Sequence, residues 1–461
     1  MSLRTQVLRG GTYLAVRQGL GMGLSLVGVV FLTRTIGPEA YGLYATTYSL
    51  YNYLYTLSQW GISICLIRRE GEAQRQDYDQ AFTLLLLLGV VAGLVALLAL
   101  PWLAWWVRLE GFRPLALAMI CGLPLNLLTL VPLARLEREL DYRQVALIEL
   151  AGQATSYAVA IPLAFQGWGA WSLIGGWWVQ QLLSCLLLYR AAKYRPAFYW
   201  NLDLAREMVS YGLGYSASMW IWQLRSLVNP LVVGRFAGAE AVGYVALAIR
   251  WVEVLSFVRN ATWRISLATL ARLQGDRQRL AAAITEGMRL QVLALGPFLL
   301  GFALVSPWLL PVVFGETWLP VLTVYPFIAL SYLVNTVFNL HSSALYVLRH
   351  NWQVTIFHAV HIALFVGAAI LLVPRLGPVG YGWAEVVTLL SYIVIHIYTV
   401  RAVGWPDYGI AVAWVGGFAL ALFWRDLGWG AGVGLLAIAL WPQTWRVLGG
   451  YMQSLRKVQH G

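Results

Sequence analysis

Charged residues are scarce in this 461-residue sequence. Its 32 Lys or Arg and 20 Asp or Glu make up 11% of the chain, whereas soluble domains carry about 25% charged residues. Apolar residues account for 60% of the chain, and the mean hydropathy is +0.67. This composition excludes an ordinary soluble globular protein and indicates a chain that crosses a membrane several times.

Cysteine is rare, and the common catalytic motifs are missing. The three cysteines, Cys65, Cys121 and Cys185, all lie in apolar runs, which argues against a disulfide framework and a thiolate metal site. The sequence has no phosphate-binding P-loop and no His/Glu pattern at metal-ligand spacing, so we expect no direct use of ATP, no cofactor and no metal. The outer loops are too short for a glycosyl-transfer site. We therefore expect a transporter without catalytic residues, not an enzyme.

Long apolar runs, by contrast, are abundant. A helix needs about 20 mostly apolar residues to cross a bilayer, and fourteen runs qualify, the last two being short and rich in glycine. The pattern predicts an all-α polytopic membrane protein with about 14 transmembrane helices. The expected spans are residues 11–33, 41–67, 80–106, 114–134, 144–165, 170–189, 208–234, 241–265, 290–314, 319–348, 352–373, 379–400, 409–424 and 428–445.

The distribution of Lys and Arg predicts the orientation. With the N-terminus inside, 21 of these residues lie in inner segments and 6 in outer segments. Because Lys and Arg gather in cytoplasmic loops, both termini are expected in the cytoplasm. The net charge of +12 is explained by this pattern, so we expect no nucleic-acid partner.

A short motif occurs twice. Arg34–Gly42 and Arg235–Gly243 share five of nine residues at a constant offset of 201. Gly167–Gly169 and Gly380–Gly382 form a weaker pair at an offset of 213. Six spans separate the copies, so both enter the membrane from the same side, which is typical of parallel repeats with a substrate site near the midplane.

The repeats predict three parts of the chain. Residues 1–195 would form an N-lobe of spans 1–6, and residues 196–402 a C-lobe of spans 7–12. Residues 403–461 would add two C-terminal helices and a cytoplasmic tail. We therefore expect two pseudo-symmetric six-helix bundles plus two further helices, with the basic stretch 190–206 as the cytoplasmic linker.

Three segments resemble a known family. Arg34–Gly42 is similar to the signature hairpin of bacterial polysaccharide transporters, Arg138–Arg143 resembles a second hallmark, and Tyr194–Pro196 with Arg206–Gly212 resembles a third. The family is the Wzx-like oligosaccharide flippase branch of the multidrug/oligosaccharidyl-lipid/polysaccharide exporter superfamily. The resemblance covers the first half of the chain well and the second half more faintly.

The resemblance implies a function. It predicts alternating access and translocation of undecaprenyl-pyrophosphate-linked oligosaccharide across the bacterial cytoplasmic membrane for polysaccharide export. The implied partners are this lipid-linked substrate, membrane lipids, H+ or Na+ as coupling ion, and the polysaccharide polymerase machinery. A multidrug or metabolite antiporter of the same superfamily is the alternative. Its lumen should favour acids, whereas the spans hold more arginine than glutamate.

A pyrophosphate that crosses a low-dielectric region requires compensating positive charge. An arginine at the bilayer centre costs about 2.5–3.5 kcal/mol on insertion scales, so arginines within spans should face water or a partner. We predict that Arg17, Arg225 and Arg250 bind the pyrophosphate. In the alternative, Arg250 pairs with Glu253 and Arg17 extends to the interface. The five arginines within the expected spans are Arg17, Arg225, Arg250, Arg259 and Arg264.

One face of the second span is lined with tyrosine. Tyr41, Tyr44, Tyr48, Tyr51 and Tyr55 follow at steps of three and four residues, with Gln59 next, which places them on one helical face. Rings can stack on sugar C–H surfaces while hydroxyls reach sugar oxygens. The predicted sugar-facing residues are Tyr44, Tyr48, Tyr51, Tyr55 and Gln59. A packing seam between helices explains the spacing equally well.

Several titratable groups lie within spans. An acid or imidazole inside the membrane is a candidate site for proton or sodium coupling, although a buried polar contact between helices explains each of them too. The candidates for ion coupling are Glu253, Glu385, His358 and His361, and Glu149 is a further titratable group in a span.

Overall fold

The computed structural model describes residues 3–69, 73–256, 270, 272–273 and 275–459. Every regular element in this described part is a helix, and the chain is a multi-pass membrane protein, as its composition predicts. It forms two compact units. Unit 1 holds residues 1–246 and 312–318, and unit 2 holds residues 247–311 and 319–461. The expected part boundaries at 195/196 and 402/403 stay predictions.

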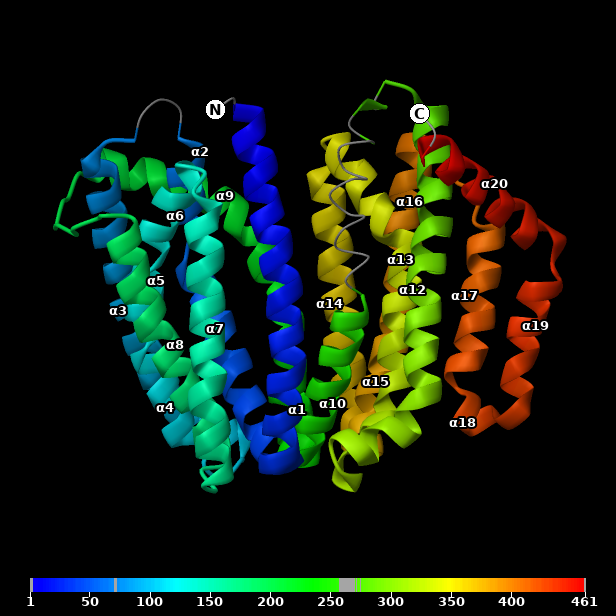
Figure 1. The fold of residues 1–461 in the computed structure, drawn as a ribbon, viewed down its shortest axis with the longest axis horizontal. Coiled ribbons are helices and arrows are strands. Elements are labelled where there is room, and N and C mark those ends of the chain that lie inside the picture. The colour runs from blue at the N-terminus through cyan, green and yellow to red at the C-terminus, as the bar shows by residue number, and fades with distance from the viewer. Residues whose placement is uncertain (1–2, 70–72, 257–269, 271, 274, 460–461) are drawn as a thin grey trace. The chain divides into compact units, whose positions relative to one another are not determined.

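Unit 1 contains helices α1 to α10, a 3-10 helix and a π-helix between α9 and α10, and the later 3-10 helix Glu316–Trp318 (Figure 1). Its buried core lies among α2, α3, α5, α6 and α8, where Leu85, Leu123 and Val131 are fully buried. The elements are α1 Leu3–Ser58, α2 Ile62–Arg68, α3 Arg75–Val107, α4 Phe112–Cys121, α5 Leu123–Leu128, α6 Leu130–Arg138, α7 Tyr142–Phe165, α8 Ala170–Ala191, α9 Leu202–Gln223, the 3-10 helix Leu224–Leu227, the π-helix Asn229–Val233, and α10 Gly234–Leu255, whose last residues belong to unit 2.

Unit 2 contains the helices that follow. Helices α17 and α19 lie side by side, joined by the short α18 (Figure 1), and a Cβ at Gly417 would overlap the backbone of Gly434. The elements are α12 Arg277–Val313, the 3-10 helix Glu316–Trp318 (in unit 1), α13 Val321–Val347, α14 Asn351–Leu376, α15 Pro378–Thr388, the 3-10 helix Leu389–Ser391, α16 Tyr392–Val403, α17 Gly409–Leu422, α18 Trp424–Leu427, the 3-10 helix Gly428–Ala431, α19 Gly432–Leu440 and α20 Pro442–Gln459.

Ten helical stretches in the described chain are long and apolar enough to cross a membrane, and Gly409–Leu422 is a shorter apolar helix. The number of crossings, expected to be 14, stays a prediction. Two of the long stretches contain a joint at a glycine with non-helical dihedral angles. Helix α1 consists of two helices joined at Gly37, so the expected spans 11–33 and 41–67 fall on either side of this glycine. Helix α10 has the same kind of joint at Gly238.

The two copies of the repeated motif have the same backbone conformation. We call Arg34–Gly42 the first motif and Arg235–Gly243 the second motif. Gly37 has φ 76° and ψ 173°, and Gly238 has φ 85° and ψ 176°. These dihedral angles lie in a region that is essentially restricted to glycine. The glycine at this position of the motif is therefore required by the backbone.

The two motifs also cross each other at glycine. A Cβ at Gly42 would overlap the carbonyl oxygen of Ala239, and a Cβ at Gly243 would overlap that of Pro38. Pro38 and Ala239 are themselves 201 residues apart, like the two glycines. The contact is therefore reciprocal within unit 1: each motif places its last glycine against the backbone of the other.

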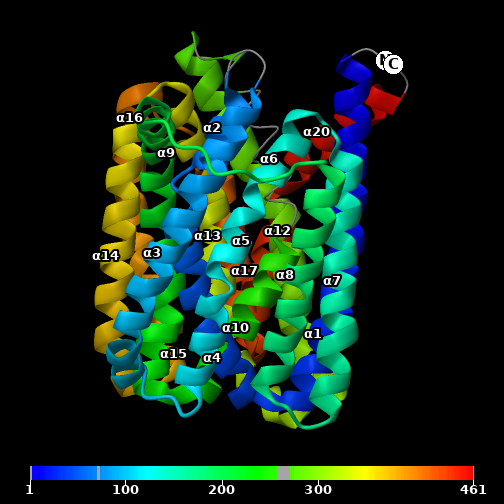
Figure 2. The ribbon, with the colours of Figure 1, turned by 90° about the vertical axis from the view of Figure 1, so that its left-hand side faces the viewer.

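An extended linker, residues 192–201, crosses the end of unit 1 between α8 and α9 (Figure 2). Polar side chains near the start of α3 hold it in place. The Tyr194 hydroxyl donates to Asp79 at 2.8 Å, and the Asn201 N–H donates to Gln80 at 2.7 Å. Burial, together with the Asp79 carboxylate, raises the pKa of Tyr194, so this hydroxyl keeps its proton. The extended part of the linker expected at 190–206 is thus bound to residues near the start of α3.

Candidate functional site

Helix α1 is joined to α7 by a series of polar contacts. The partners advance by four residues on both helices, as expected for two helices that run in the same direction with one turn per contact. Arg17 and Glu149 form an ion pair, so the charge of Arg17 is balanced within unit 1. Their side chains are 32% and 39% exposed. The contacts are Arg17 Nε to Glu149 Oε2 at 2.8 Å, Gln153 Nε2 to the Gly21 carbonyl at 2.9 Å, and Tyr157 Oη to Ser25 Oγ at 3.4 Å.

The predicted tyrosine face lies on the second half of α1, and its rings pair along the helix. Tyr44 stacks on Tyr48 and Tyr51 on Tyr55, with ring centroids 5.7 and 6.3 Å apart. Tyr51 is buried, accepts a hydrogen bond from Asn126 at 2.8 Å and meets Trp177 edge-on. Tyr48 is 39% exposed.

The tyrosine face is therefore divided. Tyr51 makes packing contacts within unit 1, as a seam between helices would require, whereas the side chain of Tyr48 is more exposed than that of Tyr51. Tyr44, Tyr55 and Gln59 are partly buried. The structure thus distinguishes members of a face that the spacing alone treats as equivalent.

Arg225 lies where a long helix becomes irregular. Helix α9 ends at Gln223, and the chain continues as the 3-10 helix Leu224–Leu227 and a π-helix that starts at Asn229. Irregular backbone at membrane depth is found where it is buried in protein or lines a cavity. Arg225 is half-buried, and its guanidinium lies 6.0 Å from the centre of the Trp222 ring.

Arg250 and Glu253 both lie on the part of α10 that belongs to unit 2. Both side chains are exposed, and both take part in interactions within the protein. They are three residues apart, so they share one face of the helix. Arg259 and Arg264, which belong to the same expected span, lie outside the described residues.

Two of the predicted coupling residues are buried and bonded to serines in unit 2. The Ser331 hydroxyl on α13 donates to Glu385 on α15 at 2.7 Å. On α14, His361 Nδ1 lies 2.9 Å from the Ser391 hydroxyl. Glu385 and His361 are 1% and 2% exposed, and His358, one turn before His361, is partly buried.

A second histidine cluster in unit 2 was not predicted from the sequence. The Tyr408 hydroxyl lies 2.6 Å from His341 Nε2 on α13 and 2.8 Å from His396 Nδ1 on α16. One residue earlier, Asp407 forms an ion pair with Arg289 on α12 at 2.6 Å. No local spacing relates these residues, because they come from four separate segments. Together they hold the start of α17 against the neighbouring helices.

Comparison with known proteins identifies the family. A family model described as "Polysaccharide biosynthesis protein" matches residues 31–323. The chain belongs to this family. It is 25% identical over 320 residues to the succinoglycan biosynthesis transport protein ExoT of Rhizobium meliloti, covering 67% of this chain and 63% of that one. It is also 25% identical over 347 residues to the lipopolysaccharide biosynthesis protein WzxC of Escherichia coli, covering 74% and 69%.

Solved structures show that this family member has a known transporter fold. The inward closed conformation of the lipid II flippase MurJ matches 96% of this chain and 99% of that chain, with a TM-score of 0.68 and 12% identity. An inward-facing multidrug MATE transporter of the MOP superfamily matches 84% and 98%, with a TM-score of 0.65 and 17% identity. The resemblance to Wzx-like polysaccharide transporters is thus confirmed, and the fold is shared with both flippases and drug transporters.

Proposed function

We propose that this protein is a flippase that moves undecaprenyl-pyrophosphate-linked oligosaccharide across the bacterial cytoplasmic membrane by alternating access, for polysaccharide export. The observation that carries this proposal is a half-buried cation, Arg225, on an interrupted span in a member of the polysaccharide biosynthesis family. The named relatives act in succinoglycan and lipopolysaccharide biosynthesis, which supports the substrate class. Both termini would lie in the cytoplasm.

Arg17, Arg225 and Arg250 are the proposed pyrophosphate ligands, and their settings differ. Arg17 is paired with Glu149 at 2.8 Å, so it would have to exchange a carboxylate for a phosphate oxygen. Arg225 lies beside the Trp222 ring on the interrupted span and takes part in a further interaction within the protein. Guanidinium groups form bidentate, charge-assisted bonds to phosphate. Both Arg17 and Arg225 would therefore exchange an interaction within the protein for a bond to phosphate.

Tyr44, Tyr48, Tyr51, Tyr55 and Gln59 are the proposed sugar-facing residues. The exposed ring of Tyr48, stacked on Tyr44, is best suited to meet a sugar C–H surface. The Tyr51 hydroxyl already accepts from Asn126, so Tyr51 would act by supporting its neighbours. This ranking supports a binding face centred on Tyr48.

Ion coupling is proposed at Glu253, Glu385, His358 and His361, with H+ or Na+ as the ion. Glu385 and His361 both have a serine hydroxyl as a partner from a neighbouring segment, so a change in their protonation would alter contacts between segments. The polymerase machinery of the pathway is a proposed partner. We propose no catalytic residue and no cofactor, since a flippase changes the position of its substrate and breaks no bond.

A direct test uses purified protein in liposomes that contain fluorescent undecaprenyl-pyrophosphate oligosaccharide. The wild type should move the lipid to the outer leaflet. Arg225→Ala and Arg250→Ala should each slow transport at least tenfold, whereas Arg250→Lys should retain more activity. Arg375 is an exposed arginine at the end of α14, and the control variant Arg375→Ala should transport the lipid as fast as the wild type. If the wild type exchanges organic cations and leaves the lipid in place, the antiporter alternative replaces this proposal.

A further inference from the structure

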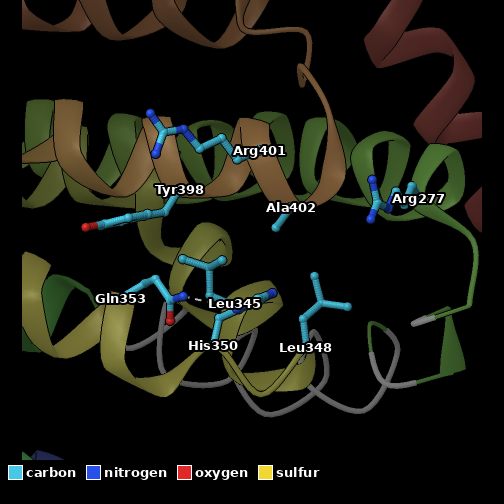
Figure 3. A pocket seen from close by; sticks show the side chains of 8 residues that line it. All are labelled: Arg277, Leu345, Leu348, His350, Gln353, Tyr398, Arg401 and Ala402. Atoms are coloured by element: carbon cyan, nitrogen blue, oxygen red, sulfur yellow. Dashed lines mark hydrogen bonds between the residues drawn. The ribbon is translucent and has the colours of Figure 1, made fainter.

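Unit 2 contains a cavity with a basic lining at one end of its helices. Its volume is about 500 Å³, within the range of about 300–1,000 Å³ that small-molecule sites occupy. Four helices contribute to it, and Figure 3 shows Tyr398 and Ala402 facing Leu345, His350 and Gln353. The lining residues are Arg277, Leu345, Leu348, His350, Gln353, Tyr398, Arg401 and Ala402.

The lining combines positive charge, hydrogen-bond donors and an apolar wall. Arg277 is the first residue of α12, and Arg401 lies in the last turn of α16. Gln353 and His350 are hydrogen-bonded to each other at 3.2 Å at the start of α14. The other described lining residues are leucines, an alanine and Tyr398. This mixture matches a ligand with an anionic head and an apolar body.

In the part of the chain that the structure describes, the positive charge of the cavity is not balanced by carboxylates. Among the described residues, no carboxylate lines the cavity and none pairs with Arg277 or Arg401. The neighbouring acid Asp276 pairs with Arg279 at 3.3 Å, and Asp407 pairs with Arg289. These two acids are thus paired with other arginines than those of the cavity.

We propose that this cavity binds the phosphate-bearing headgroup of a membrane lipid. Basic pockets between the ends of transmembrane helices bind anionic headgroups, because arginines near the surface attract them electrostatically and bond phosphate oxygens through paired N–H groups. The exposed arginines attract the phosphate electrostatically, and the apolar wall accepts the first part of the lipid chain. The site lies wholly within unit 2 and shares no residue with the proposed transport site, so it stands independently of the proposed function.

Binding can be measured on the full chain, delipidated in an uncharged detergent, by native mass spectrometry during titration with phosphatidylglycerol. Phosphatidylcholine, which has no net charge, and inorganic pyrophosphate are the comparison ligands. At about 1 kcal/mol per arginine near the surface, Arg277→Gln and Arg401→Gln should each weaken phosphatidylglycerol binding about fivefold, and the double variant about thirtyfold. The corresponding variants Arg277→Lys and Arg401→Lys, which keep the positive charge, should keep most of the affinity for phosphatidylglycerol.

Arg375→Gln is the matched control, since it removes the same charge from an exposed position at the opposite end of α14. It should bind phosphatidylglycerol like the wild type. Equal binding by the wild type and the double Gln variant would overturn the proposal, and so would pyrophosphate binding without lipid binding, which would mark a site for free anions. Transport need not be active in this experiment, so its result is separate from that of the flippase test.

Discussion

The first and second motifs have the same glycines but different surroundings for their arginines. Gly37 and Gly238 differ by less than 10° in φ and ψ, and Gly42 and Gly243 make reciprocal close contacts. Arg34, by contrast, donates to the Val312 carbonyl at 2.8 Å, whereas Arg235 lies 5.6 Å from the centre of the Trp106 ring. The repeat has therefore kept its backbone geometry while its side-chain contacts have diverged.

This difference shows which part of a repeated motif carries structural information. Glycine is kept where a Cβ would strain the backbone or collide with another chain segment, and this requirement is the same in both copies. An arginine at a helix end can find a carbonyl oxygen or an aromatic ring as a partner, and the surroundings decide which. We expect substitutions at the glycines to have similar effects in the two motifs, and substitutions at the arginines to differ.

The largest effect should follow a change at the crossing. Gly42→Ala or Gly243→Ala places a Cβ on the carbonyl oxygen of the other motif. A backbone atom, unlike a side chain, cannot avoid the overlap by changing rotamer, so the two segments must separate. We expect a loss of about 3 kcal/mol in the free energy of unfolding, the upper part of the range for overpacking, equal in both variants. Thermal unfolding in detergent measures it.

Gly23→Ala is the control for the crossing. This glycine lies on the part of α1 before the joint at Gly37, and a Cβ there would meet no heavy atom within 4 Å. Alanine at this position should leave the unfolding temperature unchanged or raise it slightly, since alanine favours the helix. A Gly42→Ala variant as stable as Gly23→Ala would show that the crossing is not a close contact.

A smaller effect should follow a change at the joints. A Cβ at Gly37 or Gly238 would meet nothing within 4 Å, so any cost comes from the backbone alone. Forcing another residue into this region costs about 1–3 kcal/mol, and we expect about 2 kcal/mol for Gly37→Asn and for Gly238→Asn in thermal unfolding. Gly111, at φ 77° and ψ −7°, has a left-handed conformation that asparagine adopts, so Gly111→Asn should be tolerated better than either.

The smallest effects should separate the two arginines. Arg34→Ala and Arg235→Ala should each cost about 1 kcal/mol, in line with an exposed charge-assisted bond at Arg34 and a partly buried cation–π contact at Arg235. In double-mutant cycles with Trp106→Leu, Arg235→Ala should be non-additive and Arg34→Ala additive. Equal coupling of both arginines to Trp106 would contradict the different partners seen in the structure.

Composition and periodicity predict the fold class and the repeat, because apolar length and glycine positions are local properties of the sequence. The partners of charged residues are not local. Glu149 lies 132 residues from Arg17 in the chain, and only the parallel packing of α1 and α7 brings them together. The basic cavity could not be predicted for the same reason. In the sequence, Arg277 and Arg401 resemble ordinary cytoplasmic loop charges, and only the fold brings the ends of four helices together around the cavity.

The tyrosine face shows a further limit. Spacing places its members on one side of a helix, but burial depends on the neighbours. Asn126 and Trp177, which surround Tyr51, come from other helices and leave no sign near Tyr51 in the sequence. The sequence therefore predicts that the tyrosines share one helical face, but it does not predict which of them are buried.

The central claim, that the protein moves a lipid-linked oligosaccharide, is tested most directly by competition in one preparation. Proteoliposomes would receive both fluorescent undecaprenyl-pyrophosphate oligosaccharide and a fluorescent organic cation, and the initial rates for both would be recorded with and without protein. The account predicts protein-dependent movement of the lipid, inhibited by unlabelled lipid-linked oligosaccharide, and no protein-dependent movement of the cation. Protein-dependent cation exchange with the lipid stationary would contradict it.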